Sequence, residues 1–169
     1  KLIAQVKLQT TPEQAESLKR TLEAANAAAN YVSATAWQQR SFRQYDLHKL
    51  TYYVVRANFG LSAQAAVRVI AKVADAYKLD KRTKRKFRPH GSIAYEDRIL
   101  SCQLNAQIVP LWTLDGRIKP PFVAGARQFK LLETRQGEAD LVYRNGEFYL
   151  LQTCDIEGPD ASAIDGFLG

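Results

Sequence analysis

The chain opens with Lys1-Leu-Ile-Ala-Gln-Val-Lys-Leu-Gln-Thr-Thr-Pro-Glu-Gln14, a stretch that joins one strand directly to the start of a helix. A period of two over residues 2–8 is typical of a strand with one buried face, and here Leu2, Ala4, Val6 and Leu8 alternate with Ile3, Gln5 and Lys7. Thr11-Pro-Glu-Gln14 then supplies an N-cap, a proline suited to the first helical position and a capping-box partner. The first strand therefore has no neighbouring strand in this part of the chain.

Three helices are predicted before residue 80. Apolar residues at steps of three and four predict a helix from the Thr11 cap to about Arg40, with a core stripe of Ala15, Leu18, Leu22, Ala25, Ala29, Val32 and Ala36. A second helix is expected from Leu47 to Phe59, capped by Asp46 and stopped by Gly60. A third starts at Ser62 and runs toward a basic stretch, with Val67, Ile70, Val73 and Tyr77 as its apolar residues.

After Pro89-His90-Gly91 the pattern changes to short segments rich in β-branched and aromatic residues, at 99–104, 108–114 and 117–123. One short helix is expected within 124–133. The clearest element is the stretch 141–154, where Asn145-Gly146 lies between two apolar runs and predicts a type I′ hairpin.

The fold class predicted from this order is α+β. The first strand is expected to join the later strands in a discontinuous domain, because no other strand precedes residue 92. Short antiparallel strands with one covering helix favour a small, OB-like antiparallel β-barrel, with the helical lobe inserted after the first strand. The expected bounds are 1–9 plus 89–158 for the β-domain, 10–88 for the helical lobe and 159–169 for a linker.

Charge is distributed unevenly along the chain. The formal net charge is +7, but residues up to Tyr95 carry 17 Lys and Arg against 6 Asp and Glu, whereas the remainder carries 7 against 11. The basic segment, Lys78-Leu-Asp-Lys-Arg-Thr-Lys-Arg-Lys-Phe-Arg88, holds seven cations in eleven residues. Such a concentration is the usual electrostatic footprint of nucleic-acid binding. A solvated charge run is the alternative interpretation.

Candidate nucleic-acid contacts fall into three groups. The basic segment is expected to contact phosphates through Lys78, Lys81, Arg82, Lys84, Arg85, Lys86 and Arg88. Arg40 and Arg43 lie in Trp37-Gln-Gln-Arg-Ser-Phe-Arg-Gln-Tyr45, where basic residues, amides and aromatics alternate. Lys49, Arg68 and Lys72 are scattered cations on the predicted helices, and each could equally be an ordinary solvated residue.

No catalytic residue and no metal ligand are assigned within the chain. His48 and His90 lack the setting of a triad or metal motif, and Cys102 and Cys154 are expected to be buried thiols in a reducing compartment. Carboxylates gather late, and a solvated acidic loop is favoured there over a two-metal site; they are Asp155, Glu157, Asp160 and Asp165. No run of apolar residues is long enough for a membrane helix.

Several runs together resemble the N-terminal half of TnpB, the OrfB-type transposon proteins. They are the opening Lys-Leu-Ile-Ala-Gln-Val-Lys-Leu with Thr-Pro-Glu-Gln, Tyr45-Asp-Leu-His-Lys-Leu-Thr-Tyr52, Gly60-Leu-Ser-Ala-Gln64, Val73-Ala-Asp-Ala-Tyr-Lys-Leu-Asp80 and Asp165-Gly-Phe-Leu-Gly169. Members of that family are RNA-guided DNA endonucleases related to type V CRISPR effectors. The resemblance implies a wedge strand, a helical recognition lobe, the rest of a wedge barrel, and then a RuvC-like nuclease.

The resemblance also implies the partners, guide RNA and target DNA, with base pairing carrying most of the specificity. It places the catalytic segment and its Mg²⁺ after Gly169, so that Asp165 is not the catalytic aspartate and 159–169 leads toward the nuclease. Tyr52 and Gln64, and more weakly Ser62, match lobe residues that face a short DNA motif beside the target. A prokaryotic, cytoplasmic protein associated with the nucleoid is expected.

Two other functions stay open from the sequence. One is a nuclease-independent DNA- or RNA-binding regulator on the same scaffold, and the other is a self-contained small metal-dependent nuclease that uses the late carboxylates. The residues encoded after Gly169 discriminate the first of these from an RNA-guided enzyme, since an intact acidic nuclease core would support the enzyme.

We expect this chain alone to show no metal-dependent nuclease activity, because its acidic residues form no recognisable metal motif. The measurement is incubation with single- and double-stranded DNA in the presence of Mg²⁺ or Mn²⁺. Cleavage that disappears when Asp155 or Asp160 is replaced would contradict this expectation and favour the small nuclease.

Overall fold

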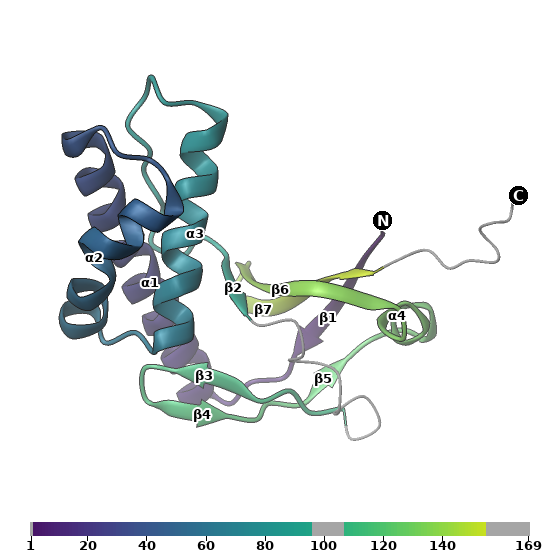
Figure 1. Ribbon diagram of the computed structural model, residues 1–169. Helices are drawn as coiled ribbons and strands as arrows, with labels where there is room; N and C mark the ends of the chain where they lie inside the picture. Colours follow the sequence, from purple (N-terminus) through teal and green to yellow (C-terminus); the bar gives the residue numbers. More distant parts are fainter. Residues whose placement is uncertain (1, 96–106, 155–169) are drawn as a thin grey trace, which may run out of the picture. The chain divides into compact units, whose positions relative to one another are not determined.

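The computed structural model describes residues 2–95 and 107–154 (Figure 1). These residues form an α+β fold of four helices and seven strands. In chain order the elements are β1 (Leu2–Leu8), α1 (Pro12–Gln39), α2 (Gln44–Phe59), α3 (Ala63–Leu79), β2 (Ile93–Tyr95), β3 (Leu111–Thr113), β4 (Gly116–Ile118), β5 (Phe122–Val123), α4 (Ala126–Leu132), β6 (Arg135–Arg144) and β7 (Glu147–Cys154).

The chain divides into two compact units. Among the described residues, the helical unit comprises 12–94 and 112–117, and the sheet unit comprises 2–11, 95, 107–111 and 118–154. The helical unit thus extends past the expected boundary at residue 88 and takes in the β3–β4 turn. Hydrogen bonds account for both additions: Asn26 Nδ2 donates to the carbonyl of Gly91, and Leu114 N donates to Thr21 Oγ1.

The sheet has the strand order β2-β6-β7-β1-β5. β1 lies between β7 and β5 and is antiparallel to both, with Leu2 opposite Cys154 and Leu8 opposite Phe122. Its alternation matches its burial, because Ala4, Val6 and Leu8 are buried while Ile3 is 54% exposed. The first residues of the chain are therefore an interior strand of a sheet completed by its last described residues.

The predicted hairpin at Asn145-Gly146 is confirmed. β6 and β7 pair with Arg144 opposite Glu147, which leaves Asn145 and Gly146 as a two-residue turn with φ of 51° and 80°. The short helix expected within 124–133 is α4. Cys154 is buried, as expected, whereas Cys102 lies outside the described residues.

The described strands form an open order with β2 and β5 at its edges rather than a closed barrel. β3 and β4 make a separate two-stranded hairpin around Leu114 and Asp115. The segment expected at 99–104 lies outside the described residues, as does the linker expected at 159–169.

The helical unit is built on α1, whose stripe of leucine, valine and alanine packs against α2 and α3. Its core includes Ala25, Ala29, Val32, Ala36, Leu47, Val55, Ile70, Val73 and Tyr77. The predicted bounds of α1 and α3 are nearly right, and Ser62 caps α3 by accepting a hydrogen bond from Ala65 N at 3.1 Å. None of the described helices is both long and apolar enough to cross a membrane.

Two details of the predicted helices are wrong. α2 begins at Gln44 after Arg43, so that Asp46 is not its cap; instead Asp46 lies in the first turn, where its carboxylate accepts a hydrogen bond from Arg43 Nε at 3.0 Å. Val67 is 36% exposed, because the buried positions of α3 are Ala66, Val69 and Ile70.

Candidate nucleic-acid interface

The end of α1 is joined to the basic segment through Arg40. This residue leaves the helix with a positive φ of 49°, and its guanidinium lies 4.6 Å from the centroid of the Trp37 ring and 5.0 Å from that of Phe42. Arg40 Nη2 also donates a hydrogen bond to the carbonyl of Lys81 at 3.3 Å. The ends of α1 and α3 therefore place their cations at the same end of the helical unit.

Asp80 organises the turn that follows α3. Its Oδ1 accepts a hydrogen bond from Arg82 N at 2.8 Å, and this bond, together with the positive charge of Arg82, lowers the pKa of the Asp80 carboxyl. Arg82 Nε and Arg85 Nη1 lie 3.6 and 3.9 Å from its two oxygens. Arg82 nevertheless stays 94% exposed, because the pair lies at the surface.

Residues 85–91, which we call the strap, are tied to α1 by their backbone. Ser33 Oγ donates to the carbonyl of Arg85 at 2.6 Å, and Arg85 N donates to the hydroxyl of the buried Tyr77 at 3.1 Å. Asn30 makes a reciprocal pair with Phe87, since its Nδ2 donates to Phe87 O at 3.0 Å and its Oδ1 accepts from Phe87 N at 2.8 Å. The strap thus runs antiparallel to α1.

Asn26 anchors the end of the strap. Its side chain is 1% exposed, and its Nδ2 donates to the carbonyls of Leu22, Pro89 and Gly91 at 2.9, 3.3 and 2.9 Å. Lys72 Nζ donates to Asn26 Oδ1 at 3.3 Å and to the carbonyl of Ser92 at 2.6 Å. His90 Nε2 lies 2.8 Å from Glu23 Oε2 on the outer side of α1.

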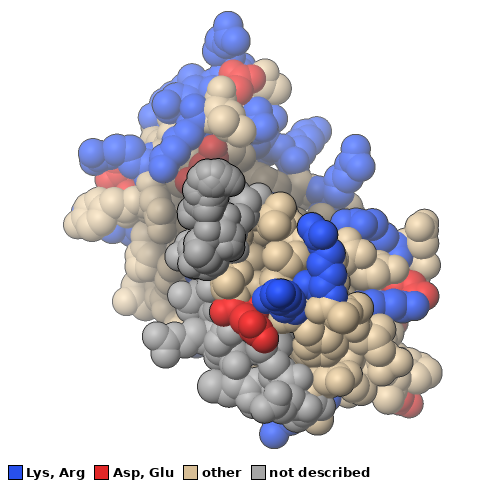
Figure 2. Space-filling view, turned by 90° about the vertical axis from the view of Figure 1, so that its right-hand side faces the viewer, with Lys and Arg blue, Asp and Glu red and all other residues tan. Residues whose placement is uncertain are grey.

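This tethering sorts the side chains of the basic segment. Arg85 and Phe87 form backbone hydrogen bonds with side chains of α1 and are half-buried. Lys84, Lys86 and Arg88, which alternate with them along the chain, are exposed. No ion pair holds these three cations within the part of the chain that the structure describes. Figure 2 shows Lys and Arg gathered at the upper end of the helical unit, where α1 and α3 finish.

The remaining candidate residues differ in exposure and in the partners of their charged groups. Lys72 is committed to hydrogen bonds inside the helical unit, whereas Arg43 and Lys78 make exposed pairs with Asp46 and Asp75. Lys49 is exposed on α2, Arg68 is half-buried on α3, and Lys81 is exposed beside the Asp80 turn. The exposed pairs of Arg43 and Lys78 contribute little to stability.

The two residues proposed to face a DNA motif lie on different helices. Gln64 is exposed in the first turn of α3, next to the Ser62 cap. Tyr52 is half-buried on α2, where it packs against the helical core and stacks on His48 with ring centroids 4.5 Å apart. Tyr52 therefore has a packing role, whatever else it contacts.

Sequence reasoning missed the residues that hold the strap. Asn26, Asn30 and Ser33 recur at steps of four and three along α1, and polar residues so spaced beside an apolar stripe indicate a second line of contacts on the same helix. It also missed Tyr53, which is 80% exposed. Its spacing of eight from Tyr45 was the available signal.

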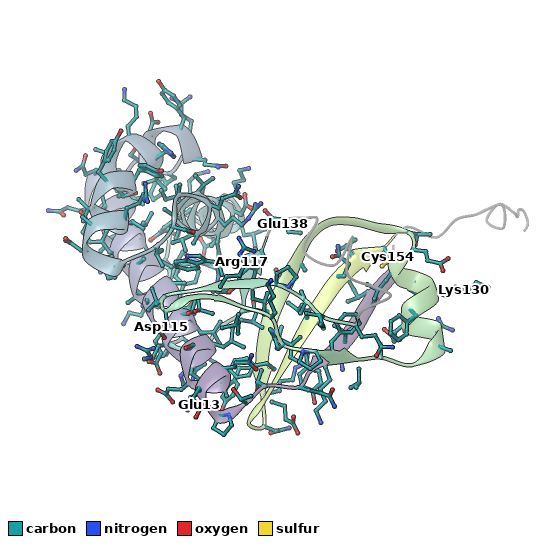
Figure 3. All side chains as sticks on the ribbon, turned by 90° about the horizontal axis from the view of Figure 1, so that it is seen from below. Glu13, Asp115, Arg117, Lys130, Glu138 and Cys154 are labelled. Atoms are coloured by element: carbon teal, nitrogen blue, oxygen red, sulfur yellow. The ribbon has the colours of Figure 1, made fainter. Side chains whose placement is uncertain are left out.

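The opposite end of α1 has mixed charge and is bound to the β3–β4 turn. Asp115, labelled in Figure 3, accepts a hydrogen bond from Ser17 Oγ at 2.8 Å and pairs with Arg20. Glu13 and Glu16 also lie in the first two turns of α1, so acidic and basic residues are mixed at this end.

Within residues 2–95 and 107–154, no group of three or more His, Cys, Asp or Glu side chains is placed to hold a metal ion. The late carboxylates Asp155, Glu157, Asp160 and Asp165 lie outside the described residues. In comparisons with known proteins, no family model matches the chain and no curated protein matches it.

Proposed function

We propose that this chain is the nucleic-acid-binding wedge and recognition-lobe portion of a TnpB-like RNA-guided DNA endonuclease, which binds guide RNA and target DNA. The observation that carries the proposal is the tethered basic segment. A solvated charge run would have a free backbone, whereas here at least six backbone groups of residues 85–91 are hydrogen-bonded to side chains of α1 and α3.

Tethering makes the cations better suited to a polyanion. Because the backbone is already ordered, binding a phosphate costs side-chain entropy but little backbone entropy. Lys84, Lys86 and Arg88 alternate with Arg85 and Phe87, whose backbone groups are hydrogen-bonded, and all three cations are exposed. They are therefore presented to solvent from one short, tethered stretch of chain.

The order of elements supports the finer parts of the proposal. A single strand, three helices and then the remaining strands is the order that the family resemblance implies for wedge, recognition lobe and wedge. In this proposal β1, β5, β6 and β7 belong to an OB-like barrel, and Gln64 and Tyr52 face the short DNA motif.

Replacing Lys84, Lys86 and Arg88 together by glutamine is expected to weaken binding to unrelated RNA and DNA sequences by about tenfold or more at moderate salt. The plot of the logarithm of the binding constant against the logarithm of the salt concentration should become less steep. Its slope should lose roughly 0.7 to 0.9 in magnitude for each phosphate no longer neutralised, a total of about 2 to 3. Fluorescence polarisation titrations at several salt concentrations measure both quantities. The fold should persist because all three side chains are exposed.

A matched control removes the same charge elsewhere. Lys119, Arg127 and Lys130 are exposed cations of the sheet unit, and Lys130 is visible on the outside of α4 in Figure 3. Replacing these three by glutamine should change affinity by less than about threefold, as a general charge effect. Equal losses in the two triple variants, or an unchanged slope in the first, would overturn the assignment of the basic segment.

A further inference from the structure

α2 carries an exposed stripe that the basic segment does not include. Tyr45, Lys49, Tyr53 and Arg56 recur at steps of four and three, which places them on one side of the helix. Tyr45 is 69% exposed and Tyr53 is 80% exposed, the largest exposed fractions of any described aromatic side chain. Lys49 and Arg56 are also exposed. The stripe therefore alternates aromatic rings with cations.

The rings of this stripe are held in place by their neighbours. Lys49 Nζ lies 5.4 Å from the centroid of the Tyr45 ring, and Tyr53 meets Tyr52 edge-on with centroids 5.2 Å apart. Tyr52 is in turn stacked on His48 and packed on the helical core. Arg56 Nε donates to the carbonyl of Leu61 at 3.3 Å. The two exposed rings are thus presented to solvent in orientations that neighbouring side chains support.

We propose that this stripe is a stacking platform for unpaired nucleotides of a nucleic-acid strand, with bases on Tyr45 and Tyr53 and phosphates on Lys49 and Arg56. The inference rests on the proposed nucleic-acid function and adds a second surface with a preference for single strands. Every base has a π-face, so aromatic platforms bind single strands with little sequence preference, whereas paired bases are stacked on one another and do not offer theirs.

Charge and dimensions favour this occupant. Asp46, which lies near the stripe, is occupied by Arg43, so the stripe itself is positive and would repel a second copy of the same face. Eight residues of helix separate the two rings by about 12 Å. At about 3.4 Å per stacked nucleotide, that distance corresponds to bases some three or four positions apart.

The test compares Tyr45→Ala/Tyr53→Ala in the whole chain with the unaltered chain. Binding to an oligodeoxythymidine strand of about 12 nucleotides should weaken at least about tenfold, while binding to a duplex of the same length changes less than about twofold. The salt slope should stay nearly the same, because every phosphate-binding cation is retained. An abasic strand of equal length should bind the unaltered chain and the variant alike.

Two further variants separate stacking from structure. Tyr45→Phe/Tyr53→Phe should retain single-strand binding, because it keeps the rings and loses only the hydroxyls. Leu50→Ala removes another exposed apolar side chain of α2, 40% exposed and off the stripe, and should have no effect. Thermal unfolding should be unchanged in all three variants.

Three results would contradict the stacking platform. Two concern the tyrosine-to-alanine variant's affinity: an equal loss on single strand and duplex, or no loss on either. The third is a change from dimer to monomer when the alanine variant is compared with the unaltered chain by sedimentation, which would make this face an interface between copies. The proposed function can fail separately from this inference. Neutralising Lys84, Lys86 and Arg88 could leave binding unchanged while the tyrosine variant loses single-strand affinity. That result would reject the basic segment as a binding surface and support the stripe as one.

Discussion

Val6→Asp is expected to lower the free energy of unfolding of the sheet unit by about 3–5 kcal/mol, enough to unfold it in most conditions. Val6 is 1% exposed and lies in an interior strand, opposite Leu150 of β7. An aspartate there would bury an unpaired charge beside Leu150 or force β1 out of the sheet. The loss in free energy of unfolding is measured by denaturant titration, with the β-sheet signal in the far-ultraviolet circular dichroism spectrum as the probe.

Ile3→Asp is the matched control. Ile3 is another β-branched residue of β1, three positions earlier and on the opposite face, and it is 54% exposed. Its replacement should cost less than about 1 kcal/mol. Since a shift of one residue exchanges the two faces of a strand, similar losses in the two variants would mean that β1 does not pair in this register.

Asn26→Ala is expected to lower the free energy of unfolding of the helical unit by about 2–3 kcal/mol and to free the strap from α1. The change removes the donor shared by the carbonyls of Pro89 and Gly91 and the acceptor of Lys72 Nζ. Limited trypsin digestion is the most direct measurement, because the basic segment is rich in Lys and Arg and becomes a substrate once its backbone leaves α1.

Asn58→Ala serves as the control for this variant. Asn58 is an exposed asparagine in the last turn of α2, so its loss should be within about 0.5 kcal/mol and should leave digestion unchanged. If the Asn26 variant were cut after Arg85 or Lys86 no faster than the unaltered chain, the strap would not depend on this anchor. Nucleic-acid binding should also weaken, because the cations would then be displayed from a disordered backbone.

Local patterns were sufficient for most of the elements. The period of two over residues 2–8, the α1 stripe, the Gly60 stop and the Asn145-Gly146 turn each depend on a few neighbouring residues, and each is found where it was expected. The start of α2 was misplaced because Asp46 is a good cap by type, yet its carboxylate is used by Arg43 one turn earlier. Caps depend on competition among nearby donors, which residue type alone does not express.

The candidate site divides along the same line. The basic segment has seven cations in eleven residues, and this property of the sequence predicts an affinity for polyanions in any conformation. The sequence does not predict which of those cations are exposed. Lys84, Lys86 and Arg88 are exposed because Ser33, Asn30 and Asn26, which precede them by more than 50 residues, bind the alternate backbone groups.

Composition, periodicity and turn chemistry act over a few residues, and they alone were enough for the order of strand, helices and hairpin and for the concentration of charge before Tyr95. Contacts between segments distant in the chain decide the rest. They place Lys72 in hydrogen bonds inside the helical unit, tether residues 85–91, and leave Tyr45 and Tyr53 exposed. Such contacts depend on how α1, α2 and α3 pack, because packing selects which face of each helix is buried and which donors and acceptors meet.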